Sequence, residues 1–203
     1  MSRAIRLCLT ALVMTGVLAA LVGHHAMRRA GGTEIYLDME PVDPRDLLLG
    51  HYVVLTTPLH RIDTAEVDGP DEGFARGDLV FVSLRETESG SMVPAGVYRE
   101  PPGGLFVRGR LEDAYVEQEF SEPEPLEDGS PGWRAEPIPG TARDVLRIRY
   151  NLERYFAPKD QALALETMRN ENRLRLIASI GADGGAVIKG LEIDGERRIE
   201  ELF

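Results

Sequence analysis

Cysteine and lysine are nearly absent from this sequence. Cys8 is the only cysteine, and Lys159 and Lys189 are the only lysines. One cysteine excludes an internal disulfide and a cysteine-based zinc cluster, and its place in an apolar run excludes a cysteine nucleophile in the rest of the chain. His51 and His60 have no third ligand placed near them in the sequence. The sequence therefore predicts no metal site and no cofactor.

Beyond the first 30 residues, carboxylates outnumber basic residues by a wide margin. The formal net charge is -11, and four arginines precede Glu34, so residues 34–203 carry -15. A body this acidic repels phosphate backbones and anionic lipid head groups. We expect no nucleic acid partner. The composition, 43% hydrophobic and 28% charged, is nevertheless typical of a folded globular protein.

The one long apolar run is at the N-terminus. Leu7 to Gly23 contains no charged residue over 17 positions, which is the lower limit for a helix that crosses roughly 30 Å of hydrocarbon. We interpret it as a membrane anchor. A cleaved signal peptide is the alternative, because Arg3 and Arg6 precede the run and Val17-Leu18-Ala19 within it offers small residues at a cleavage spacing. Both interpretations export the body.

Orientation and location follow from the flanking charges. Arg3 and Arg6 precede the apolar run, while Arg28 and Arg29 follow it, so the positive-inside rule favours a cytoplasmic N-terminus only slightly. We predict a single-pass protein of the inner membrane with its body in the periplasm or another extracytoplasmic space.

The rest of the chain is expected to be mainly β, of the α+β class. Short apolar or β-branched runs alternate with clusters of Gly, Pro and Asp, which are typical of the turns between strands in β domains. One helix is predicted over 158–172, and a short helical turn ends at Gly50. The expected strands cover 33–37, 52–57, 79–84, 97–100, 105–111, 146–152, 174–180 and 186–193.

A weak internal repeat predicts two related β-rich units, at 34–111 and 143–203. Between them, residues 112–142 are rich in carboxylates and prolines. We interpret this stretch as an acidic linker or loop, because its carboxylates lack the spacing of a calcium loop. Residues 1–30, which contain the predicted anchor, form the first segment of this predicted domain organisation.

Two segments resemble a known bacterial family. Residues 43–55 (Asp-Pro-Arg-Asp-Leu-Leu-Leu-Gly-His-Tyr-Val-Val-Leu) and 149–158 (Arg-Tyr-Asn-Leu-Glu-Arg-Tyr-Phe-Ala-Pro) are similar to the GDYXXLXY family, named for Gly-Asp-Tyr-x-x-Leu-x-Tyr. His51 stands at the Asp of that motif and Thr57 at its second Tyr. The resemblance implies a membrane-anchored protein of unknown biochemical function. It also implies a polytopic membrane protein, encoded nearby, as a partner.

The same two segments supply the candidate binding residues, since an aromatic and a charge at a strand end can line a groove. The competing interpretation places the aromatics in the core and pairs Arg154 with a carboxylate. The candidate binding residues are Gly50, His51, Tyr52, Leu55, Arg154, Tyr155 and Phe156.

We find no set of residues in the sequence that predicts catalysis. Ser91-Met-Val-Pro is similar to the nucleophile region of membrane-anchored signal peptidases, but such a serine needs a desolvated lysine beside it. We expect a non-catalytic binding or assembly protein. The alternatives are a membrane-anchored hydrolase or peptidase that uses Ser91 or His51, and a small-molecule or glycan-binding module with a cleft at Tyr52, Arg154 and Phe156.

Overall fold

A computed structural model describes most of the chain. The predicted helical turn ending at Gly50 lies outside the described residues, and only the backbone is described for Tyr52, Glu124, Pro125, Trp133 and Lys159. The described residues are 3–41, 52–69, 73–122, 124–125 and 133–199.

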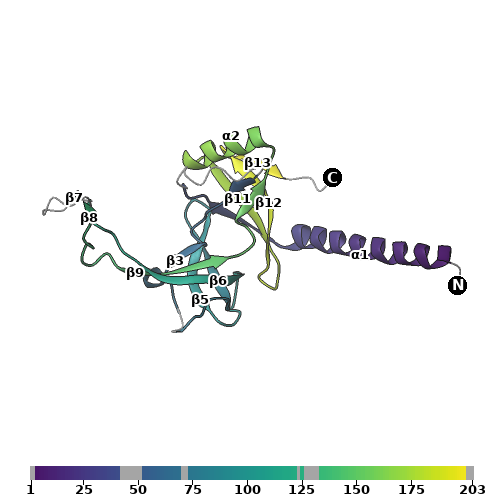
Figure 1. Cartoon of the computed structure of the whole chain (residues 1–203), viewed down its shortest axis with the longest axis horizontal. Coiled ribbons are helices and arrows are strands. Elements are labelled where there is room, and N and C mark those ends of the chain that lie inside the picture. Colours follow the sequence, from purple (N-terminus) through teal and green to yellow (C-terminus); the bar gives the residue numbers. More distant parts are fainter. Residues whose placement is uncertain (1–2, 42–51, 70–72, 123, 126–132, 200–203) are drawn as a thin grey trace.

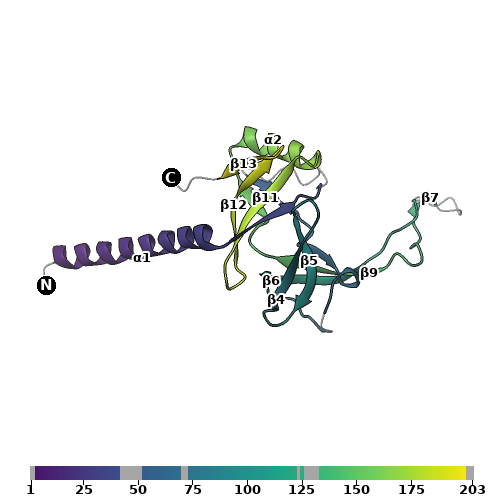
Figure 2. The same ribbon diagram turned by 180° about the vertical axis from the view of Figure 1, so that it is seen from behind.

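Helix α1 (Arg3–Gly31) extends away from the rest of the protein as a single rod (Figures 1 and 2). Its 29 residues correspond to a length of about 43 Å. Leu7, Leu12 and the other large apolar side chains of the helix are exposed on all sides. In the described part of the chain it is the one helix long and apolar enough to cross a membrane. The predicted run from Leu7 to Gly23 forms its middle.

A four-stranded antiparallel sheet follows directly, with Gly32 as the only residue between α1 and its first strand. The strand order is β1-β11-β12-β13, so the first strand of the body pairs with a strand near the C-terminus. The bounds are β1 (Thr33–Asp38), β11 (Leu174–Ile180), β12 (Ala186–Ile193) and β13 (Glu196–Ile199). Here β11 and β12 match the predicted strands residue for residue.

A five-stranded antiparallel sheet forms the other large part of the body. Its order is β3-β9-β6-β4-β5, which places β9 between strands that precede it by tens of residues. The bounds are β3 (Arg61–Asp63), β4 (Leu79–Glu86), β5 (Met92–Tyr98), β6 (Phe106–Glu117) and β9 (Arg143–Arg149).

Two small antiparallel pairs complete the strands. One joins β2 (Tyr52–Val54) to β10 (Arg154–Phe156), and the other joins β7 (Glu124–Pro125) to β8 (Trp133–Arg134). The predicted strand 52–57 is therefore shorter than expected. Helix α2 (Lys159–Asn170) lies inside the predicted range 158–172 and packs on β2.

One hydrophobic core joins the two large sheets. It takes in Ile35 and Leu176 of the four-stranded sheet together with Val80 and Ile148 of the five-stranded sheet. Each sheet draws strands from both predicted units, so neither 34–111 nor 143–203 supplies a sheet by itself. The chain is β-rich with an N-terminal helix, as the sequence predicts.

The stretch predicted as an acidic linker is in part regular. Strand β6 continues to Glu117, and its carboxylates face arginines of the neighbouring strands, as with Asp113 and Arg147 at 3.3 Å. Beyond it the chain leaves the sheet as an extended arm, at the end of the molecule opposite α1 (Figure 1).

Candidate functional site

The two segments that carry the family motif lie side by side. Strands β2 and β10 pair antiparallel, with Tyr52 opposite Phe156, Val53 opposite Tyr155 and Val54 opposite Arg154. A further bond, from the amide of Leu55 to the carbonyl of Glu153 at 2.8 Å, extends the pairing. Segments a hundred residues apart thus form one ribbon, which we call the motif ribbon (residues 52–55 and 153–156).

The candidate residues divide between the core and the surface. Leu55 is buried, so it packs in the core and presents nothing to a ligand. Arg154 and Phe156, two positions apart on β10, are exposed, and Phe156 keeps 72% of its surface accessible. Tyr155, between them, is half-buried. Gly50 and His51 lie outside the described residues.

A cluster of buried polar groups lies just behind the ribbon. The amide and the hydroxyl of Thr57 each lie 3.0 Å from Nδ1 of His60. Because an amide N–H can only donate, Nδ1 is the acceptor and the ring proton is assigned to Nε2. Nε2 in turn lies 3.5 Å from Oε1 of Glu153. Tyr150 packs edge-to-face on His60, with ring centroids 5.7 Å apart.

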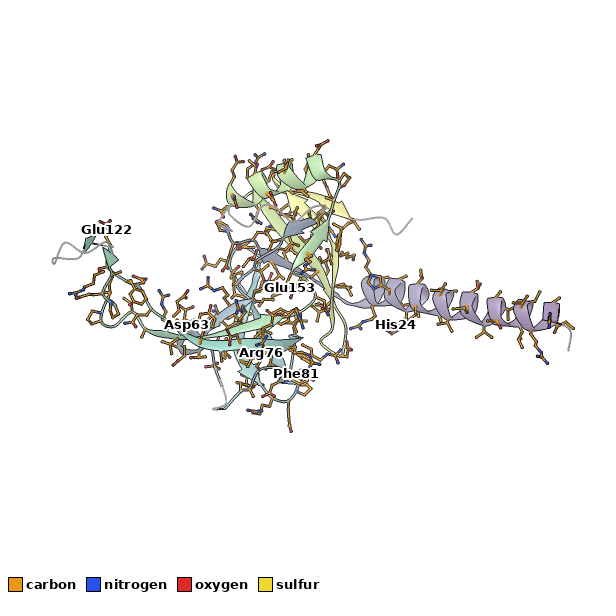
Figure 3. All side chains as sticks on the ribbon, in the orientation of Figure 1. His24, Asp63, Arg76, Phe81, Glu122 and Glu153 are labelled. Carbon is orange, nitrogen blue, oxygen red and sulfur yellow. The ribbon has the colours of Figure 1, made fainter. Side chains whose placement is uncertain are left out.

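Glu153 is the acceptor at the centre of this cluster, in the middle of the body (Figure 3). Its Oε1 accepts from the amides of Tyr150 at 2.6 Å and Asn151 at 3.2 Å. Asn151 adopts φ +65°, which turns the chain back toward the carboxylate. Burial raises the pKa of Glu153, but the interaction with His60 and the hydrogen bond from the Tyr150 amide outweigh it, so the pKa lies below its ordinary value of 4.5.

Helix α2 contributes a buried arginine to the ribbon. Arg169 is 2% exposed, and its Nη1 donates to the carbonyl of Val54 at 2.6 Å. Burial lowers the pKa of Arg169, and the nearby Glu166 opposes that effect. The sequence analysis missed Arg169, Glu153 and the placement of His60. The pattern that could have found Arg169 is its spacing of seven from Ala162, on the same buried helix face.

The buried cluster resembles the hydroxyl–imidazole–carboxylate chain of a catalytic triad, yet a substrate cannot reach its hydroxyl group. Thr57 is fully buried, so no substrate carbonyl can reach its hydroxyl in this conformation. Among the described residues, Nε2 of His60 has no hydrogen-bond partner and lies 3.5 Å from Glu153, while the bonds of the other groups fix the motif ribbon against the core. We therefore assign the cluster a structural part in the site.

The hydrolase alternative predicts Ser91 or His51 in a pocket beside Lys189 or a carboxylate. His51 lies outside the described residues, and Ser91 has a carboxylate beside it. Ser91 is buried, and its hydroxyl donates to Asp38 at 2.6 Å. Lys189 bonds to Glu34 at 2.7 Å. The serine and Lys189 are thus each bonded to a different carboxylate and do not form a dyad.

A polar cleft of about 510 Å³ opens beside β1, β11 and β12, and Arg173, Glu192 and Asp194 are among its lining residues. Arg173 bonds to Asp194 at 2.6 Å. Its lining holds three carboxylates and two arginines, and neither Arg154 nor Phe156 lines it. Among the described residues, no group of three His, Cys, Asp or Glu side chains could hold a metal ion.

A protein-family model described as "GDYXXLXY protein" matches residues 14–191, which include most of α1, the motif ribbon, β11 and most of β12. No curated protein and no solved structure gives a match.

Proposed function

This chain belongs to the GDYXXLXY protein family, and from that premise we propose that it is a single-pass inner-membrane protein whose extracytoplasmic β body binds another membrane protein. The anchor, the orientation of the chain, the joint between anchor and body, and the exposed face of the motif ribbon each support one part of this proposal.

The exposure of α1 supports the anchor. None of its most apolar stretch is buried against the body, so its side chains need another apolar environment. A helix that is apolar on all sides gains that environment in a bilayer. Its length of about 43 Å exceeds the roughly 30 Å hydrocarbon layer, which leaves turns at both ends for the interfaces.

The arginines at the C-terminal end of α1 support an extracytoplasmic body. Arg28 pairs with Asp183 at 3.1 Å, and Arg29 donates to the carbonyl of Lys189 at 2.6 Å. The body thus engages the charges that follow the span. Arg3 and Arg6 remain as the basic residues that precede it, which favours the N-terminus in the cytoplasm.

The short joint between α1 and the body supports the part of the proposal that identifies the partner as a membrane protein. The carbonyl of Arg28 accepts from Ser179 at 3.2 Å, and strand β1 begins after Gly32 alone. A short, bonded joint restricts the body to a small range of directions relative to the membrane. A fixed direction suits a surface that meets a neighbour in the same membrane, because a free tether would serve diffusing partners better.

We place the contact on the motif ribbon. Arg154 and Phe156 face outward there, and aromatic and arginine side chains dominate the affinity of many protein interfaces. Arg169 and Glu153 hold the ribbon from behind, so the two exposed side chains are presented on a fixed backbone.

Co-purification of the affinity-tagged full chain from detergent-solubilised membranes tests the proposal. We expect one integral membrane protein to accompany the wild-type chain, and a Gly-Ser linker inserted between Gly31 and Gly32 to abolish its recovery. Phe156→Ala should reduce recovery about tenfold, as for loss of a central anchor residue.

The same linker inserted between Gly103 and Gly104, in an exposed loop, is the matched control and should leave recovery unchanged. Protease added outside the cytoplasmic membrane should degrade the body in all variants. The proposal fails if the wild-type chain recovers no membrane protein, or if the body is protected from that protease.

A further inference from the structure

The arm beyond β6 is an ordered two-stranded extension at the end of the molecule farthest from α1, where Figure 3 labels Glu122 (Figures 1–3). Its described residues are 118–122, 124–125 and 133–142. The amide of Ser121 donates to the carbonyl of Glu136, and the amide of Ile138 to the carbonyl of Glu119, both at 2.8 Å. These bonds hold the two strands together.

The two outer edges of the arm differ in what they offer. Phe120 and Pro137 form an antiparallel bridge whose bonds come from the residues on either side. In such a pair, the amide and carbonyl of each residue point away from the other strand. The Phe120 edge therefore presents a donor and an acceptor. On the other edge, Pro137 and Pro139 have no N–H to donate.

The Phe120 edge continues an edge of β6. Strand β4 pairs with β6 from Phe106 to Arg110, and Leu111 makes the next bonds, with Gly77 and Asp78. Within the described part of the chain, the ladder on this side of β6 ends at Leu111. A strand that continued the place of β4 along residues 112–122 would extend an existing sheet.

Large apolar side chains are exposed along this edge. Val116 is 62% and Phe120 58% exposed, and Ile138 on the other strand of the arm is 39% exposed. By the register of the bridge, Phe120 and Ile138 lie on opposite faces of the arm. A two-stranded extension with uncovered apolar residues on both faces is only marginally stable. An added strand alternates its side chains between the two faces and so covers both.

Charge identifies the occupant. Along this edge the carboxylates Glu112 and Glu119 pair on one side with Arg149 and Arg143, at 3.4 and 3.2 Å. A basic strand on the open side would repeat that alternation of charge. A second copy would bring together two bodies of charge -15, which disfavours self-association.

We propose that residues 112–122 bind an extended, basic segment of a partner protein by β-strand addition, in a contact separate from the motif ribbon. Backbone bonds to the open edge supply the binding, Val116 and Phe120 cover the apolar side chains of the segment, and its basic residues face the carboxylates. The position of the arm places this partner away from the membrane.

Binding of short synthetic peptides to the full chain in neutral detergent tests the proposal. The probes are an alternating Lys-Val peptide and an alternating Glu-Val peptide of equal length. A fluorescent label on each peptide reports binding through its anisotropy. We expect the Lys-Val peptide to bind with an affinity that falls as salt rises, and the Glu-Val peptide not to bind.

Phe120→Pro removes the outward N–H and should weaken binding about tenfold or more, whereas Phe120→Leu, which keeps the N–H and an apolar side chain, should bind within about threefold of wild type. Unfolding curves of both variants check that the body remains folded. Equal binding of the two peptides, or equal binding by the two variants, would overturn the proposal. So would self-association of the chain that the Lys-Val peptide does not reverse.

Discussion

The imidazole of His60 lies 3.5 Å from the carboxylate of Glu153, across the junction between the motif ribbon and the core. That separation is long for a hydrogen bond, so the contact is mainly electrostatic. The carboxylate of Glu153 also accepts hydrogen bonds from the amides of Tyr150 and Asn151. One carboxylate thus fixes the turn that leads into β10 and the loop that follows β2.

Glu153→Gln should destabilise the body in a pH-dependent way. The folded-state pKa of Glu153 lies below 4.5, so its ionised form contributes stability above that pH, and the contribution is lost as the pH falls through the folded-state pKa. We expect the variant to unfold with about 1–3 kcal/mol less free energy at pH 7. The difference from wild type should shrink below pH 4.5.

Urea unfolding of the full chain in detergent, repeated across pH, measures this difference. Glu88→Gln, at an exposed position in the turn between β4 and β5, is the control and should follow wild type. A constant difference between Glu153→Gln and wild type across the acidic range would contradict the role assigned to the charge.

Gly32→Ala should disrupt the joint, while Gly31→Ala should not. A Cβ at Gly32 would lie 2.7 Å from the carbonyl oxygen of Ile180, and nothing lies within 4 Å of a Cβ at Gly31. Backbone cannot move aside cheaply, so we expect Gly32→Ala to lower stability by about 1–3 kcal/mol. Thermal melts of the two variants provide the comparison, and equal melting temperatures would refute the close approach.

Arg169→Met should weaken the attachment of α2 to the motif ribbon. The change keeps much of the apolar stem but removes the donor to the carbonyl of Val54, which then lacks that bond. A loss of about 1–3 kcal/mol follows from an unsatisfied buried acceptor. Hydrogen exchange should show faster exchange in β2 and β10. Arg198→Met, at an exposed position of β13, should change neither measurement.

Ser91→Ala should affect stability and leave labelling by serine-directed reagents unchanged. Ser91 is buried and bonded to Asp38, whose exposed carboxylate can bind water in its place. We therefore expect a loss of about 0.5–1.5 kcal/mol. A fluorophosphonate reagent should label neither wild type nor variant. Labelling of wild type that the substitution removes would restore the hydrolase alternative.

Sequence reasoning identified the elements whose patterns are local. The apolar run in α1, the Gly-rich turn between β11 and β12, and the helix after Pro158 each carry their own signal. The insertion of β9 between β3 and β6 carries no such local signal. Alternation with a period of two shows which face of a strand is buried, but it does not show which strand lies beside it. For the same reason, residues 112–117 could be taken for a solvated linker: their arginine partners lie on other strands.

The candidate site was predictable only as two segments. The family resemblance indicated β2 and β10, but the side chains that fix them come from positions outside the motif. His60 looks isolated in the sequence, and Arg169 looks like an ordinary charge on a polar helix. Burial of such groups depends on tertiary contacts that no local pattern encodes.

The pairing of β1 with β11 also sets an order of assembly. Ribosomes make the strand that follows α1 early, and its neighbour in the sheet, with Thr33 opposite Ile180, emerges almost at the end of synthesis. In the interval, the first strand is unpaired, and the growing chain has an open strand edge next to α1. A chain that stops before Leu174 keeps α1 and never completes the sheet, so its unpaired edge is prone to aggregation and misassembly.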